Sequence, residues 1–194
     1  MEIVRKTIEN DEEFLRQVSE EVDFEKDDVQ DIIKRLEYYF QTNSCYAMAP
    51  IQIGIPKRII YIKNTKQDMR NNDNHDYNEK RIMINPIILN KKGITEFLEG
   101  CESCLDYVGL VERPYQIEVE YYDINGIKKI ETIKDLESTI FSHEYDHLNG
   151  ILHLDIAKEI FRMNREETKL YREDHPYKVI SKDCEWNEDI NKNK

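Results

Sequence analysis

The stretch from Ser142 to Leu148 reads Ser-His-Glu-Tyr-Asp-His-Leu, and it constrains this chain more than any other segment. His143 and His147 are four positions apart, so on an α-helix they lie one turn apart on the same face, where both imidazoles can bind one metal ion. Glu144 follows the first histidine and can act as a base on a water molecule at that ion without being a ligand itself. The pattern His-Glu-x-x-His therefore predicts a hydrolytic metal site on a helix. The alternative is an exposed helix that carries two histidines and no metal.

Length and composition favour one globular domain. The chain has 194 residues, which is enough to bury a proper core but would be cramped as two domains. We predict a single domain over residues 1–186 and a disordered tail over residues 187–194. The 4 cysteines are expected to be free thiols or metal ligands rather than disulfides, as is usual inside cells.

Charge and hydropathy exclude several classes of partner. The net charge of −12 disfavours direct nucleic-acid binding, because 40 acidic side chains repel a phosphate backbone. No apolar run approaches the length of a membrane span, and the first ten residues lack the apolar core of a secretion signal. We therefore expect a cytoplasmic protein with no membrane partner.

Hydrophobic periodicity predicts a mixture of helices and strands. Helical spacing of apolar residues is found over three ranges: 26–42, 134–148 and 157–173. Alternating or β-branched runs predict strands over residues 58–63, 81–85, 87–89, 94–98 and 177–180. A hairpin of residues 116–123 and 127–133 is expected around Asn125-Gly126, a strong turn sequence. The polar stretch 64–80, with His75, is expected to be a surface loop.

A catalytic metal ion of this type usually has three protein ligands and one open position, so the histidine pair needs a third partner. Three carboxylates on the predicted helix 157–173 are candidates: Glu159, Glu166 and Glu167. Upstream stand Cys101 and Cys104, next to Gly100, where the backbone can approach closely. A thiolate is the chemically favoured ligand, because it binds Fe(II), Zn(II), Co(II) and Ni(II) at neutral pH. The residues by themselves leave both groups of candidates open.

Three segments resemble, in order and in kind, the three motifs of the peptide deformylase family. They read AMAPIQIG from Ala47 to Gly54, EGCES from Glu99 to Ser103, and HEYDHLNG from His143 to Gly150. The resemblance spans most of the chain and favours Cys101 over Cys104 as the third ligand. It implies an α+β fold in which antiparallel β-sheets pack around a central helix that bears the HExxH motif.

The resemblance also implies how the metal and the base are arranged. Cys101, His143 and His147 would hold one divalent ion, with Fe(II) as the ion in the cell and Zn, Ni or Co able to replace it. Glu144 would be the general base and then the general acid. The implied reaction is hydrolysis of the formyl group from N-formylmethionine at the start of nascent polypeptides, with release of formate. Contact with the ribosome is implied as well.

Further residues gain roles from the same resemblance. The side-chain amide of Gln52 and the backbone N–H of Glu102 would stabilise the oxyanion. Glu99 would pair with Arg113 and hold the second motif in place. Two residues of the first motif would pair their backbone with the substrate peptide as an added strand: Tyr46 and Ala47.

Departures from the family pattern motivate two alternatives. Cys45 and Ala47 stand where the first motif normally has glycines, Pro50 replaces an alanine, and Asp135 stands where a glycine is common before the metal-binding helix. One alternative is therefore a deformylase-like protein that binds metal or peptide with weak or no turnover. The other is an HExxH metallopeptidase, which would take its third ligand from downstream.

Overall fold

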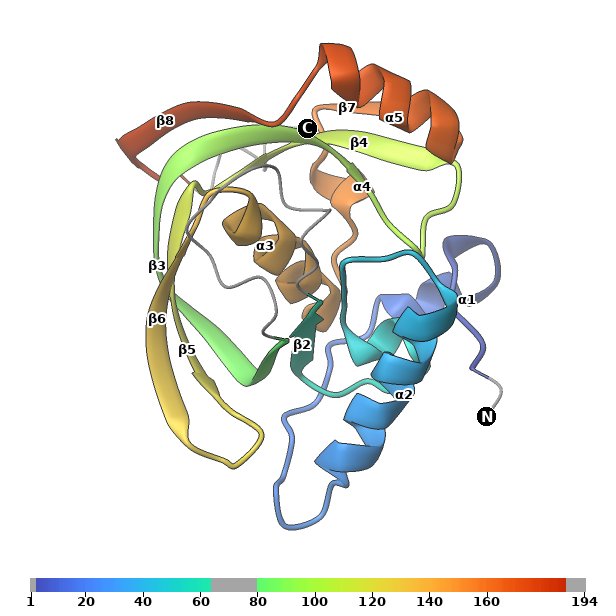
Figure 1. Cartoon of the computed structure of the whole chain (residues 1–194), viewed down its shortest axis with the longest axis vertical. Coiled ribbons are helices and arrows are strands. Elements are labelled where there is room, and N and C mark those ends of the chain that lie inside the picture. The colour runs from blue at the N-terminus through green and yellow to red at the C-terminus, as the bar shows by residue number, and fades with distance from the viewer. Residues whose placement is uncertain (1–2, 64–79, 188–194) are drawn as a thin grey trace.

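A curved antiparallel sheet wraps around helix α3 (Leu136–Leu148) in the computed structural model, which describes residues 3–63 and 80–187 (Figure 1). The strands are β1 (Ala47–Met48), β2 (Ile59–Ile62), β3 (Arg81–Gly100), β4 (Tyr107–Arg113), β5 (Gln116–Tyr122), β6 (Lys128–Lys134), β7 (Glu159–Arg162) and β8 (Lys178–Glu185). The other helices are α1 (Ile8–Leu15), α2 (Val29–Thr42), the 3₁₀ helix η1 (Pro50–Ile53), α4 (His153–Ile156) and α5 (Arg165–Asp174). The predicted α+β class with antiparallel strands around the HExxH helix is confirmed.

Strand β3 is the longest strand and the one with which most other strands pair. The prediction of three short strands over residues 81–98 is therefore wrong. Strand β3 runs unbroken for 20 residues and pairs with β2, β4, β5 and β8. Asn85 takes a positive φ of 51°, and the register against β5 shifts between Ile84 and Ile87. The resulting bulge accommodates Pro86, which has no N–H to donate, without ending the strand. As a consequence, β3 carries Glu99 and Gly100 directly to the region of α3.

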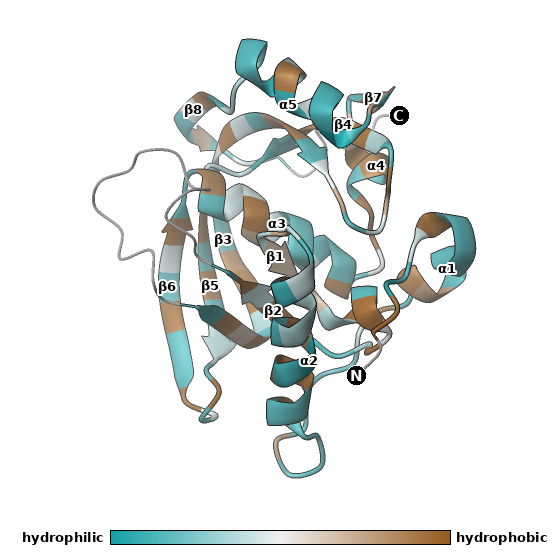
Figure 2. Ribbon diagram, turned by 45° about the vertical axis from the view of Figure 1, so that its right-hand side comes forward, coloured by the Kyte–Doolittle hydropathy of each residue, from teal (hydrophilic) through white to brown (hydrophobic). Residues whose placement is uncertain are grey.

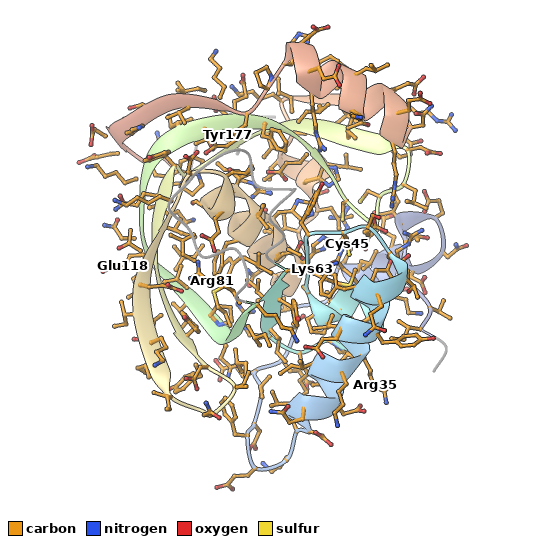
Figure 3. All side chains as sticks on the ribbon, viewed as in Figure 1. Arg35, Cys45, Lys63, Arg81, Glu118 and Tyr177 are labelled. Atoms are coloured by element: carbon orange, nitrogen blue, oxygen red, sulfur yellow. The ribbon has the colours of Figure 1, made fainter. Side chains whose placement is uncertain are left out.

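The hairpin predicted around Asn125-Gly126 forms as β5 and β6, and it covers one side of α3. Gly126 takes a φ of 73° in the turn. Figure 2 shows brown and teal segments along both strands; on β5 buried residues alternate with more exposed ones, whereas Ile130 of β6 is 58% exposed. Ile117 and Val119 are fully buried in the cluster around Phe141 of α3, whereas Glu118 lies on the outer face (Figure 3).

Helix α3 is held at both ends, so the side chains on it are fixed in space. Near its start, the Ser138 hydroxyl donates a hydrogen bond of 2.7 Å to the Pro114 carbonyl. At its end, the Arg58 guanidinium donates to the Leu148 carbonyl and to the Asn149 side chain, both at 3.2 Å. The predicted helix over residues 134–148 is thereby confirmed, beginning two residues later than expected.

Helix α2 confirms the helix predicted over residues 26–42. It packs on the face of β2 opposite to α3. It starts at Val29 because the Asp28 carboxylate caps it by accepting from the Asp31 N–H at 2.9 Å. Its apolar residues pack on one face against β2: Val29, Ile32, Ile33, Leu36, Tyr39 and Phe40.

The predicted helix over residues 157–173 is wrong in its first half. Residues Glu159–Arg162 form β7, which pairs with β4, and only Arg165–Asp174 form helix α5. Asn164 separates the two, because its side chain accepts hydrogen bonds from the N–H groups of Glu166 and Glu167 and starts a new helix there. The outward-facing α5 is drawn mostly in teal in Figure 2.

Two further predictions concern the chain as a whole. The expected surface loop over residues 64–80, with His75, and the expected tail over residues 187–194 lie almost entirely outside the described residues, and the single-domain boundaries stay a prediction. Among the helices of the described ranges, none combines the length and the apolar character needed to cross a membrane.

We expect Gly150→Ala to destabilise the protein far more than Gly126→Ala. Both glycines have a φ near 70°, at 71° and 73°, so alanine is strained at either position. At Gly150 the added Cβ would also lie 2.2 Å from the Arg16 carbonyl oxygen, whereas at Gly126 the nearest atom is 3.9 Å away. The free energy of unfolding should fall by about 1 kcal/mol for Gly126→Ala and by about 3 kcal/mol or more for Gly150→Ala. Equal losses in urea unfolding would show that the contact with Arg16 is unimportant.

Candidate metal centre and active site

The end of β3 and helix α3 bring three candidate ligands together. The donor atoms of Cys101, His143 and His147 all lie within 4.8 Å of one another. The Cys101 sulfur is 3.1 Å from Nε2 of His147. The two histidines share one face of α3, as their spacing predicted, with ring centroids 5.1 Å apart.

A buried carboxylate orients the first histidine. Oε2 of Glu99 is 2.8 Å from Nδ1 of His143, which leaves Nε2 as the ring nitrogen available to a metal ion. Nε and one terminal nitrogen of Arg113 donate to Glu99 at 2.8 and 2.9 Å, and Arg113 also donates to Asp146 on α3. Burial alone would raise the pKa of Glu99, but the Arg113 guanidinium outweighs it and holds that pKa well below the usual range. The Glu99 carboxylate is therefore charged, and it connects β3, on which it lies, to β4 and α3.

Glu144, the residue after His143, lies in a different environment from Glu99. Its side chain is only 4% exposed, and within the described part of the chain its Oε2 has no hydrogen-bond partner. Burial raises the pKa of this carboxyl, and the neighbouring imidazoles of His143 and His147 offset part of that shift. A carboxylate with a raised pKa and a free oxygen is suited to accept and return a proton.

The side-chain amide of Gln52 points toward the Cys101 sulfur. Oε1 of Gln52 accepts a hydrogen bond of 3.0 Å from the Ala49 N–H, which fixes which end of the amide faces the site. Nε2 is 3.6 Å from the Cys101 sulfur and 3.3 Å from the Ser103 hydroxyl. Pro50 begins η1 at a position where the missing N–H costs nothing, so this departure from the family motif supports the placement of Gln52.

The residues after Cys101 form a tight turn around its sulfur. The Ser103 N–H lies 3.3 Å from the sulfur, a contact that the sequence analysis missed. The Glu102 carboxylate accepts hydrogen bonds from Arg5, Tyr39 and Arg165, the last at 2.6 Å. These partners come from the N-terminus, α2 and α5, and no local pattern in the sequence could have identified them.

Strand β1 lies at the end of the strand order, next to this site. Ala47 pairs with Ile62 of β2, and the carbonyl of Tyr46 accepts from the Lys63 N–H at 2.7 Å. In the strand order of the sheet, β1 has β2 as its neighbour and is followed by nothing on its other side within the described residues. The flanking residues Cys45 and Lys63 lie near the centre of the view in Figure 3.

The donor set fits a divalent transition-metal ion. One thiolate and two neutral imidazoles bind Fe(II), Zn(II), Ni(II) and Co(II), and three protein ligands leave a position for substrate or water. The three alternative ligands are exposed and lie on β7 and α5: Glu159, Glu166 and Glu167. The structure does not bring them to the histidines.

A helix-borne HExxH pair completed by an upstream cysteine, with a buried glutamate beside it, defines a metal-dependent hydrolase class. The family model described as polypeptide deformylase matches residues 4–163. A peptide deformylase of Pelagibacter ubique is 34% identical over 158 residues, which cover 81% of this chain and 88% of the relative.

Two solved structures share the fold. A probable peptide deformylase from the Synechococcus phage S-SSM7 has a TM-score of 0.68 at 31% identity, over 79% of this chain and 99% of the phage protein. A peptide deformylase from Synechococcus elongatus, solved in complex with actinonin, has a TM-score of 0.69 at 26% identity, over 89% and 87% of the two chains. The chain therefore belongs to the polypeptide deformylase family, which confirms the predicted family and the predicted class of enzyme, a hydrolase.

We expect Glu99→Gln to destabilise the fold strongly. The substitution removes the charge that faces the buried Arg113 guanidinium and should lower the free energy of unfolding by about 3 kcal/mol. Glu120→Gln is the matched control, because Glu120 pairs with Lys128 on the partly exposed hairpin at 2.7 Å. Its loss should stay within about 1 kcal/mol. If chemical denaturation of the metal-free proteins gives similar losses for both variants, the Glu99 carboxylate is not what joins the three elements.

Proposed function

We propose that this chain removes the formyl group from N-formylmethionine at the N-terminus of nascent polypeptides and releases formate. The observation that carries the proposal is the meeting of the Cys101 sulfur with His143 and His147 beside the buried Glu144. A cysteine ligand upstream of the HExxH helix separates this arrangement from a metallopeptidase with a downstream ligand. Membership of the deformylase family points to the same reaction.

Cys101, His143 and His147 hold one divalent ion in this proposal, with Fe(II) as the ion in the cell and Zn, Ni or Co as replacements. When bound, such an ion would polarise the formyl carbonyl as a Lewis acid and would lower the pKa of a water molecule toward neutrality. Glu99, itself held by Arg113, keeps the ring of His143 in one orientation for metal binding.

The protein's own side chains then carry the proton and the developing charge. Glu144 accepts a proton from water as the oxygen attacks the formyl carbon. Nε2 of Gln52 and the backbone N–H of Glu102 donate to the carbonyl oxygen as it becomes negative, which is worth about 3 kcal/mol for each donor. Glu144 then returns the proton to the methionine nitrogen as the carbon–nitrogen bond breaks. The products are formate and a free amino terminus.

The substrate backbone binds along β1 in this proposal. An extended peptide can add to the end of a sheet through main-chain hydrogen bonds, and Tyr46 and Ala47 provide the strand beside Gln52. Nascent chains are the substrate class, so we infer that the enzyme works in the cytoplasm near the ribosome. The net charge of −12 makes direct binding to ribosomal RNA unfavourable.

We expect Glu144→Ala to abolish turnover while bound metal is retained. Removal of a general base and acid should lower kcat for formate release from a formyl-Met peptide by about 100- to 10,000-fold. Glu137→Ala is the control on the same helix, because Glu137 pairs with Arg81 and lies outside the donor set. A Glu144→Ala protein that holds metal and turns over like the parent would remove Glu144 from the mechanism.

We expect Cys101→Ala to lose the ion that the parent protein retains. With two imidazoles left, Fe(II) should be stripped by a chelator concentration that leaves the parent loaded. Cys184→Ala, on β8, is the control and should keep its metal. Full retention of Fe(II) in Cys101→Ala, measured by elemental analysis, would favour the metallopeptidase alternative with a ligand from elsewhere.

A further inference from the structure

A second group of metal-binding side chains lies against the first. The donor atoms of Cys101, Cys104 and His153 also fall within 4.8 Å of one another. Cys104 and His153 are each only 1% exposed. The mechanism proposed above uses neither of them, although both are chemically competent ligands.

His153 is the less ordinary of the two residues. It lies on α4, and its ring centroid is 5.4 Å from that of His143. Within the described part of the chain, neither Nδ1 nor Nε2 of this buried ring has a hydrogen-bond partner. A buried polar group without a partner costs about 1–3 kcal/mol, so a ring with two such nitrogens calls for a ligand.

The surrounding backbone fixes both side chains in place. The Cys104 N–H donates to the Cys101 carbonyl at 3.1 Å, which closes the turn that carries both sulfurs. Helix α4 packs closely on β4 because Gly109 has no side chain. A Cβ there would lie 2.7 Å from Cβ of Ala157 and 3.3 Å from Cδ2 of His153. The His153 ring is thus held beside the two sulfurs by packing.

We propose that Cys101, Cys104 and His153 form a second metal site that takes Zn²⁺ or a similarly soft divalent ion. Two thiolates and one imidazole are a donor set that such ions prefer. The Cys101 sulfur is common to both groups, and a thiolate has enough lone pairs to bridge two ions. The competing account is that the Cys104 thiol only donates a hydrogen bond to Cys101 and that His153 only packs.

Zinc stoichiometry tests the second site directly. Metal-free, fully reduced parent protein is titrated anaerobically with Zn²⁺ in competition with a chromophoric chelator. The parent should bind two equivalents, and Cys104→Ser and His153→Phe should each bind one. Cys184→Ser is the control and should bind two, because that cysteine belongs to neither donor group.

Cobalt provides a second readout that does not depend on activity. Thiolate-to-cobalt absorption in the near ultraviolet should grow during both the first and the second equivalent of Co²⁺ in the parent. In Cys104→Ser the growth should stop after the first equivalent. One variant alters the sulfur and the other the imidazole, so misfolding of either still leaves a test.

One equivalent of Zn²⁺ in the parent would overturn the proposal, and so would two equivalents that persist in both variants. The outcome is separate from the proposed function. A protein that binds one ion and releases formate would keep the deformylase assignment and lose only the second site.

Discussion

The buried Glu99 carboxylate is the point on which the rest of the structure depends. It lies at the end of β3, accepts two hydrogen bonds from Arg113 of β4, and contacts Nδ1 of His143 on α3. Breaking a buried pair of this kind leaves an uncompensated charge, which costs about 3–5 kcal/mol. One charged group thereby fixes the relative position of three elements. Because Cys101 is two residues further along the chain, the same group sets where the thiolate meets the histidines.

Two buried carboxylates at the site have unlike surroundings. Glu99 faces a guanidinium, so its pKa is held low and it stays charged. Glu144 is buried without a guanidinium partner, so its pKa is raised above the usual value. In the proposed mechanism, Glu99 orients the ring of His143 and Glu144 carries the proton. The different neighbours of Glu99 and Glu144 explain why their pKa values shift in opposite directions.

Local patterns were enough for the parts of the fold that are locally determined. The spacing of His143 and His147, the Asn125-Gly126 turn and the apolar face of α2 each predicted the element that formed. Two failures have physical reasons. Residues 81–85 and 87–89 were predicted to be separate strands, but a bulge at Asn85 let β3 continue through Pro86. Residues 157–173 had helical spacing, but pairing of β7 with β4 took the first part.

For the site, too, local sequence identified some residues and missed the contacts that depend on tertiary structure. Cys101 could be singled out by its resemblance to a family motif, but the contacts of Glu102 with Arg5, Tyr39 and Arg165 join segments that are distant in sequence. The nearness of His153 to Cys104 likewise depends on the packing of α4 against Gly109. Such contacts follow from tertiary structure and leave no periodic trace.

The central claim is that the altered first motif still supports deformylation. The most direct test compares formyl-Met and acetyl-Met versions of one peptide on the same anaerobic sample, loaded with Fe(II) and assayed for metal content. We predict formate release in proportion to bound metal, with little acetate from the acetyl peptide. Metal-loaded protein that binds the formyl peptide but releases no formate would contradict the account and favour a binding protein without turnover.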